Sequence, residues 1–347
     1  MDKYTTFRNK SGSISFQINK KTITVLSLLS CLMLVMLIIG LSIGSTMINP
    51  LVVLKHLLGA KIDKYAFIIN ILRLPRILLA LLVGAALGVS GLILQGTIRN
   101  PLASPNIIGI TGGASAAAVL FISYFSKTLS IKWLPLAAII GAGIVSFIIY
   151  TLAWKEGVTP IRLVLIGIGM AAAMNALTTL MIVLSPIATT IKSYTWLTGS
   201  VYGANWTDVY AMLPWVIVFI PLALLFSRIL NVQELGDQVA YSLGVRVQFY
   251  RFSLLFISVA LAGSAVAFAG GIGFVGLIAP HIARKLVGRS FAALVPTSAM
   301  IGGLTVFLAD LIARTLFLPL DLPAGVFVSG IGAPFFIYLL YINRNRV

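Results

Sequence analysis

Long apolar runs separated by short polar segments dominate this chain. Each run approaches or exceeds the ~20 apolar residues with which a helix crosses ~30 Å of hydrocarbon. The pattern predicts an all-α polytopic membrane protein, because a helix satisfies its own backbone hydrogen bonds where no water is present. The runs cover residues 22–48, 74–98, 105–126, 133–154, 163–185, 209–230, 252–286, 291–318 and 325–342.

The run 252–286 is long for one helix and short for two, and it contains a glycine-rich break at Gly270–Gly273. Basic residues precede the first run and follow the last one, and such residues favour the cytoplasmic side of a membrane. With both termini in the cytoplasm, the number of crossings is even. We therefore expect 252–286 to form two short helices, which gives about ten transmembrane helices.

This topology divides the chain into three parts. Residues 1–21 form a cytoplasmic N-terminal segment, 22–342 a single transmembrane domain with a cytoplasmic loop at 231–247, and 343–347 a cytoplasmic tail. The first run exceeds the ~7–15 apolar residues of a signal peptide and lacks a small-x-small cleavage site, so we expect it to be retained as a span.

Composition supports the membrane assignment. Mean hydropathy is +1.06 and only 10% of the residues are charged, against about 25% in a soluble domain. The net charge of +17 is spread between apolar runs rather than along a stripe with aromatic residues, which argues against nucleic-acid binding. In this topology 16 of the 25 Lys and Arg residues lie inside, but the outer segment 49–76 also carries five.

Several kinds of chemistry are absent from the sequence. With a single cysteine, Cys31, and two histidines, a dedicated metal site is not expected. Gly271–Gly276 fits the G-x-G-x-x-G pattern, but it lacks the preceding strand and the following acid of a dinucleotide site. No G-x-x-x-x-G-K-[ST] motif occurs, so we expect this chain neither to hydrolyse ATP nor to bind a cofactor of its own.

Glycines at helical spacing predict close contacts between spans. Small residues let helix backbones approach each other in a membrane, where packing rather than the hydrophobic effect drives association. The candidate packing residues are Gly84, Gly88, Gly109, Gly113, Gly271, Gly273 and Gly276.

Arg73 and Arg76 stand at the beginning of the second span, on the outer side in this topology. Arginines at a helix end commonly anchor it in the membrane interface. Guanidinium groups also form strong pairs with carboxylates, so a docking site for an acidic partner is an equal alternative. On the ninth span, Asp310 and Arg314 are four residues apart and are expected to pair, since an uncompensated charge is costly inside the membrane.

Two cytoplasmic segments carry candidate functional residues. The prolines and the Asn-Pro step of 99–105 predict a stiff loop, which serves either as a connector or as a gate. In 231–245, Glu234 and Asp237 are exposed acids, and Gly236 and Gly244 delimit a short helix. That helix either caps the bundle or docks a peripheral protein.

Taken together, these segments resemble the FecCD permease family, the membrane subunits of binding-protein-dependent ABC importers for iron–siderophore complexes and vitamin B12. The resemblance runs in family order from the second span to the last. One departure is Asp321-Leu-Pro323, where the family usually has Glu-Leu-Pro. The matching stretches are RLPRILLALLVGAALGVSGLILQ (73–95), RNPLASPNIIGITGGA (99–114), ELGDQVAYSLGV (234–245), GGIGFVGLIAPHIARKLVG (270–288) and ADLIARTLFLPLDLPAGVFVSGIGAPFFIYLL (309–340).

The resemblance implies a vitamin B12 permease-like bundle of ten helices in a bacterial cytoplasmic membrane. The expected partners are ABC ATPase subunits, which use the ATP, an extracytoplasmic binding protein, and a second permease subunit, identical or not, with the fifth span lining a central path between the two. The implied residues are Arg73, Arg76 and Arg314 for docking of the binding protein; Glu234, Leu235, Gly236, Asp237, Ser242, Leu243 and Gly244 for coupling to the ATPase; and Asn100, Pro101, Leu102, Thr159 and Pro160 for the cytoplasmic gate.

The expected function is therefore import of iron(III)–siderophore complexes by a non-catalytic membrane subunit, with vitamin B12 or haem as alternative cargo. An ion-coupled secondary transporter is the alternative from a different class, but it should carry a relay of intramembrane acids, and only Asp310 qualifies. An intramembrane enzyme needs a catalytic cluster, and His281 has no companion for one.

Overall fold

The computed structural model describes residues 4–8, 15–60, 63–126, 128–317 and 320–343. Most of the expected tail, residues 344–347, lies outside these ranges. The elements are β1 (Tyr4–Arg8), β2 (Ser15–Asn19), α1 (Lys20–Ser42), α2 (Pro50–Leu57), α3 (Asp63–Phe67), η1 (Ile68–Arg73), α4 (Leu74–Ile98), α5 (Ile110–Leu120), η2 (Phe121–Phe125), η3 (Ile131–Trp133), α6 (Leu134–Ala153), α7 (Pro160–Val183), α8 (Ile187–Leu197), α9 (Trp206–Leu225), α10 (Ser227–Glu234), α11 (Asp237–Ser242), α12 (Val247–Ala269), α13 (Val275–Val287), α14 (Phe291–Leu316) and α15 (Ala324–Asn343).

The helical membrane fold expected from the apolar pattern is confirmed. Within the described ranges, seven helical segments are long and apolar enough to cross a bilayer: Lys20–Ser42, Asp63–Ile98, Ile131–Ala153, Pro160–Val183, Trp206–Leu225, Val247–Ala269 and Phe291–Leu316. Two shorter apolar helices, Ile110–Phe125 and Ala324–Tyr338, correspond to the third and last expected spans. With the 13-residue α13, they correspond approximately to the ten or so expected segments.

The run 252–286 divides at its glycines, as the sequence predicts. α12 ends at Ala269, Gly270 adopts a φ of 70°, and α13 begins at Val275. The expectation of two short helices is wrong for the first of them, because α12 extends back to Val247 and has 23 residues. Only α13, with 13 residues, is short.

Several elements that the apolar runs did not predict lie between the spans or before the first one. The outer segment 49–76 contains α2, and its second half continues through α3 and η1 into α4 as one 36-residue helical segment. α8 follows α7 in the segment after the fifth span. The N-terminal segment forms an antiparallel pair of strands in whose register Phe7 of β1 is paired with Phe16 of β2. Alternating short strands carry a weaker sequence signal than a span.

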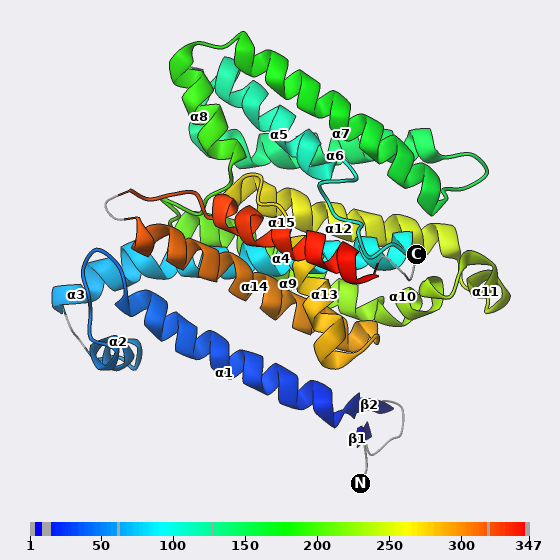
Figure 1. Cartoon of the computed structure of the whole chain (residues 1–347), viewed down its shortest axis with the longest axis horizontal. Helices are drawn as coiled ribbons and strands as arrows, with labels where there is room; N and C mark the ends of the chain where they lie inside the picture. Colours follow the sequence, from blue (N-terminus) through cyan, green and yellow to red (C-terminus); the bar gives the residue numbers. More distant parts are fainter. Residues whose placement is uncertain (1–3, 9–14, 61–62, 127, 318–319, 344–347) are drawn as a thin grey trace.

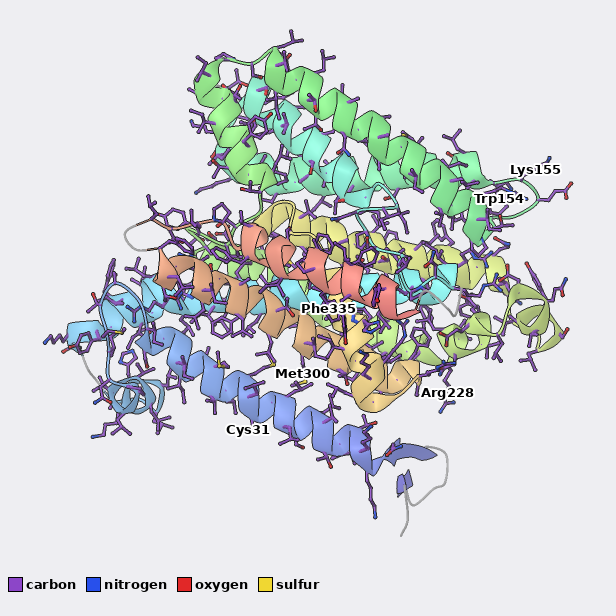
Figure 2. All side chains as sticks on the ribbon, in the orientation of Figure 1. Cys31, Trp154, Lys155, Arg228, Met300 and Phe335 are labelled. Atoms are coloured by element: carbon purple, nitrogen blue, oxygen red, sulfur yellow. The ribbon has the colours of Figure 1, made fainter. Side chains whose placement is uncertain are left out.

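Figure 1 shows α5, α6, α7 and α8 as one group that lies beside a larger group built around α4. α4 packs against α9, α12, α13 and α14, while α12 also contacts α5 and α6 and so joins the two groups. α1 lies at the edge of the larger group, and only 6% of its apolar window is buried by protein. Cys31 on α1 is exposed and points away from the bundle in Figure 2.

The two ends of the bundle carry different elements. α10 and α11 lie at one end, together with the start of α1 and the end of α15 (Figure 1). Trp154 and Lys155, in the loop between α6 and α7, lie at the same end in Figure 2. We call this the inner end, and the opposite end, with α2, α3 and α8, the outer end. The first and last spans therefore begin and finish at the same end, as an even number of crossings requires.

Glycines bring α4 against its neighbours at backbone distance. Gly84 meets the backbone of Gly302 on α14, and a Cβ added at Gly88 would come within 2.5 Å of the Ser298 carbonyl oxygen. One turn further along α4, Gly91 meets the backbone of Gly276 on α13. Side chains at these positions would force the helices apart, so these glycines set the spacing of the larger group.

The other candidate packing glycines contact different partners. Gly109, with a φ of 83°, faces Gly167 of α7, and Gly113 faces Gly141 and Val145 of α6. Gly271 lies against the Leu197 carbonyl at the end of α8, and Gly273 lies near the amide of Asn106. Gly271 and Gly273, at the α12–α13 break, therefore contact mainly the end of α8 and the loop before α5, and Gly273 also lies near Ser329 of α15.

Substituting alanine for Gly91 should destabilise the fold. The added methyl group collides with the Gly276 backbone, and overpacking of this kind costs about 1–3 kcal/mol. The thermal unfolding midpoint of the purified protein in detergent should fall. Gly143→Ala in α6 is the matched control, since a Cβ there meets no atom within 4 Å; alanine is the better helix former by about 1 kcal/mol. Equal midpoints for the two variants would contradict this account of Gly91.

Candidate functional site

At the outer end, Arg76 joins two carboxylates from distant parts of the chain. Its Nη2 donates to Asp310 Oδ1 at 2.7 Å and its Nε donates to the same oxygen at 2.9 Å. Its Nη1 and Nη2 donate to the two oxygens of Asp321, each at 2.7 Å. Arg76 therefore ties α4 to α14 and to the segment before α15 through the paired geometry in which a guanidinium binds carboxylates best.

Two further arginines, Arg314 and Arg73, lie near the ion pairs that Arg76 makes with Asp310 and Asp321. Arg314, one turn after Asp310 on α14, has its Nε 3.8 Å from Asp310 Oδ2, and its Nη2 donates to the Gly40 carbonyl at 2.6 Å. Arg73 donates to the carbonyls of Leu41 and Thr46, each at 2.6 Å. These carbonyls belong to the end of α1 and the segment after it, where helical C=O groups have no partner within the helix. We call Arg73, Arg76, Arg314, Asp310 and Asp321 the outer cluster.

The sequence anticipated only part of the outer cluster. The predicted pairing of Asp310 with Arg314 is confirmed, but the nearer partner of Asp310 is Arg76. The three arginines are buried, with exposed fractions of 5 to 8%, whereas the side chain of Asp321 is 27% exposed. Tyr202 lies over the Arg76 guanidinium, 5.4 Å from ring centroid to Cζ. The proposed docking role of these arginines stays a prediction.

At the inner end, α10 and α11 form a projecting turn. Glu234 ends α10, and Gly236 adopts a φ of 115°, a conformation that only glycine reaches easily. Leu235 and Leu243, on either side of α11, are 65% and 62% exposed. Ser242 and Gly244 are exposed beside them. The predicted short helix is present, and it presents two apolar side chains on a polar loop.

Of the two acids predicted to be exposed in this turn, Glu234 is exposed, whereas Asp237 is half-buried and is held from two sides. Asp237 accepts hydrogen bonds from Arg251 Nη2 at 2.8 Å with both carboxylate oxygens. Its Oδ1 also lies 3.4 Å from Arg99 Nη2. Arg251 belongs to α12 and Arg99 follows the last residue of α4, so Asp237 connects the turn to two spans.

The two candidate gate loops lie next to these arginines. After Arg99, the Asn100 side chain accepts a hydrogen bond from the Leu102 amide at 2.9 Å and closes a tight turn around Pro101. In the second loop, Thr159 is the residue before α7 and Pro160 is its first residue, where a proline is well tolerated. Both loops are short and locally constrained.

A neutral polar cavity of about 390 Å³ opens between α5, α7 and α8 near the break before α13. Its wall carries side-chain hydroxyl and amide groups and none with a formal charge. The wall therefore offers weak hydrogen-bonding groups and no fixed ionic partner. The polar lining residues are Asn106, Thr111, Ser115, Asn175, Thr178, Thr179 and Tyr194.

The sequence missed the pairing partners at both ends. The sequence marks Asp321 only as a departure from the usual Glu-Leu-Pro, and it assigns no partner to Arg99 or Arg251. The small number of acidic residues was the available signal. The chain has only eight, and because a charge beside a span is costly without a partner, each such acid implies a nearby cation. Which cation it pairs with depends on the helix arrangement, which local spacing does not give.

Metal binding by the protein itself has no support in the described ranges. No three His, Cys, Asp or Glu side chains there lie close enough together to hold an ion. His281 lies within α13 and packs edge-to-face on Phe335 at 5.8 Å between ring centroids.

The comparisons with known proteins cover nearly the whole chain. The signature of the FecCD transport family matches residues 32–342. The achromobactin transport system permease protein of Dickeya dadantii is 51% identical over 336 residues, covering 97% of this chain and 96% of that protein. The iron(3+)-hydroxamate import system permease protein of Bacillus subtilis is 43% identical, covering 92% and 97%.

A solved structure gives the same result for the fold. It is a transporter of the metal-chelate ABC type in an inward-facing conformation, and it superposes with a TM-score of 0.82 at 31% identity, covering 92% of this chain and 99% of that one. The resemblance suggested by the sequence motifs is thus confirmed, and the chain belongs to the FecCD transport family.

Proposed function

We propose that this chain is the membrane-spanning permease subunit of an ABC importer that carries iron(III)–siderophore complexes into the cell. The observation that carries the proposal is the family match over 32–342, together with similarity along almost the full length to permeases named for achromobactin and for iron(3+)-hydroxamate. The chain supplies the path, and partner subunits supply the ATP hydrolysis and the ligand capture.

The inner turn is the proposed contact with the ATPase. α10 and α11 project from the inner end, and exposed Leu235 and Leu243 give the turn an apolar surface that a cleft can bury. ATP-driven closure of two ATPase subunits would then move the turn as a rigid body against the spans. Asn100–Leu102 and Thr159–Pro160 are the proposed gates, because they lie at the same end of the spans.

The polar cavity is the proposed wall of the path. On α7, Asn175 and Thr179 are exposed within a helix whose apolar window is only 17% buried, so much of α7 is free to face a second permease subunit. Two such subunits would enclose a path between them. A neutral hydroxyl and amide lining suits a bulky chelate, which must be released as easily as it enters.

The outer cluster is the proposed docking point for the binding protein. The cluster contains three guanidinium groups and two carboxylates, which leaves a positive excess for an acidic partner. Asp321 is the most exposed carboxylate of the cluster, and an incoming carboxylate would replace it on Arg76. Docking then exchanges one carboxylate for another instead of filling an empty site.

Uptake measurements test the cargo. Bacteria that lack the gene should lose ATP-dependent accumulation of at least one labelled ferric siderophore but keep cobalamin uptake. Reintroducing the gene should restore the siderophore accumulation. Vesicles with the permease alone should accumulate nothing against a gradient, because the chain contains no ATPase motif. Loss of cobalamin or haem uptake with all ferric chelates unaffected would reject siderophore cargo.

Variants at the outer cluster test docking by exchange. Asp321→Asn removes the competing charge and should tighten binding of the purified binding protein to the reconstituted complex, by about three- to tenfold. Arg76→Gln should weaken binding by a similar factor. Surface plasmon resonance or microscale thermophoresis measures both.

Controls separate docking from folding. Reversing Arg73 and Arg76 to glutamate should abolish docking while ATPase assembly is kept, but it sets a carboxylate against buried Asp310, so the neutral variants are the cleaner test. Asp63→Asn removes an exposed acid of the same end and should leave affinity unchanged. Unaltered affinity in both Asp321→Asn and Arg76→Gln would rule out this docking point.

A further inference from the structure

The carboxylate of Asp237 stands where three segments of the inner end meet. It is the first residue of α11, and it binds Arg99 after α4 and Arg251 on α12. Its side chain is 25% exposed and that of Arg251 is 1% exposed. An ion pair at such a boundary is less screened by water than one on the open surface, so it holds its segments together more firmly.

The first connection leads to the Asn100–Leu102 loop. Arg99 ends α4 with a φ of 58°, in the left-handed region that a non-glycine residue rarely occupies. It directly precedes Asn100, whose side chain closes the turn. The Arg99 guanidinium also lies close to Gly236, since a Cβ there would come within 3.2 Å of Nη1. A shift of Asp237 therefore acts on the residue from which this loop starts.

The second connection leads to the Thr159–Pro160 loop. Arg251 donates through Nη2 to Asp237 and through Nη1 to the carbonyl of Val158, the residue before Thr159. Gln248, almost one turn earlier on α12, holds the same residue: it accepts from the Val158 amide at 3.0 Å and donates to its carbonyl at 3.3 Å. Asp237 is thus the counter-ion of a side chain that holds the second loop.

We propose that Asp237 is the positioning residue that links the inner turn to both gate loops, so that one movement of the turn displaces the two loops together. The inference rests on the proposed function, in which the turn receives the ATPase and the loops are gates. It adds the physical connection between them: Asp237 to Arg99 and Asn100 on one side, and Asp237 through Arg251 to Val158 on the other.

The charge of the Asp237 carboxylate is what connects the two arginines to the turn. The carboxylate accepts hydrogen bonds from Arg251 and forms an ion pair with Arg99, and loss of its charge would leave Arg251 buried without a counter-ion. A glutamate would restore the charge one methylene further out, whereas an asparagine has the right shape without the charge. The effect of each replacement on coupling can therefore be separated from its effect on shape.

The test uses the complete complex with its ATPase and binding protein, reconstituted in vesicles, and measures ferric siderophore uptake and ATP hydrolysis together. Asp237→Asn should lower the uptake per ATP hydrolysed by about tenfold, while ATPase subunits still co-purify. Asp237→Glu should recover part of the ratio. Arg99→Gln, which breaks only the more exposed of the two connections, should give an intermediate loss.

Glu156→Gln is the matched control. Glu156 is an exposed acid of the α6–α7 loop at the same end of the bundle, and in the described part of the chain it takes part in no ion pair. Its substitution removes the same charge without touching either connection, so the uptake per ATP should stay at the wild-type value. Should Asp237→Asn fail to assemble, Arg99→Gln against this control decides the question.

A distance measurement reports on the gates directly. With Cys31 replaced by serine, spin labels at Leu102→Cys and Thr159→Cys give the separation of the two loops with and without a bound ATP analogue. The nucleotide-dependent change should be present with Asp237 and lost in Asp237→Asn. The link would be overturned if the nucleotide-dependent change in distance persisted in Asp237→Asn. It would also be overturned if Asp237→Asn gave the same uptake per ATP hydrolysed as Glu156→Gln. A wild-type complex that transports no ferric chelate would instead reject the proposed function.

Discussion

Inside a bilayer, a charged side chain must find its partner within the protein, because the surrounding lipid offers none. This constraint shapes both ends of the bundle. At the outer end Arg76 binds Asp310 and Asp321, and at the inner end Arg251 binds Asp237. Each ion pair joins segments that glycine contacts alone would leave free to slide. The ion pairs of the described residues therefore lie where helices must keep their register.

Between these ends, the packing rests on backbone contact. Gly84, Gly88 and Gly91 let α4 approach α13 and α14 so closely that no side chain fits between them. The group α5–α8 packs differently, with α7 largely uncovered and a polar cavity beside it. The protein therefore has a tightly joined group around α4 and a more open group along the proposed path, with α12 in contact with both.

The sequence predicted the membrane class, the approximate spans and the break at Gly270–Gly273, because these depend on local composition and on glycine. It also predicted the contact between Asp310 and Arg314, which is set by helical spacing. It could not assign Asp310 to Arg76 or Asp237 to Arg99, since these pairs arise from helix packing across the chain. It missed α2 and α8 because neither helix belongs to an apolar run long enough to span the membrane. The family resemblance implies the roles of the candidate site residues, and the structure shows the contacts through which these residues can act.

The break before α13 bears on the environment inside the polar cavity, the proposed wall of the path. A helix of 13 residues rises about 20 Å, less than the ~30 Å of hydrocarbon. Unwound backbone at such depth persists only where protein or water satisfies its peptide groups, and Gly271 lies in the cavity wall. The polar lining can also bind water, so we expect the cavity to be hydrated. A chelate on the proposed path would then keep much of its aqueous shell, which would lower the energetic barrier to crossing without any strong attachment to the wall.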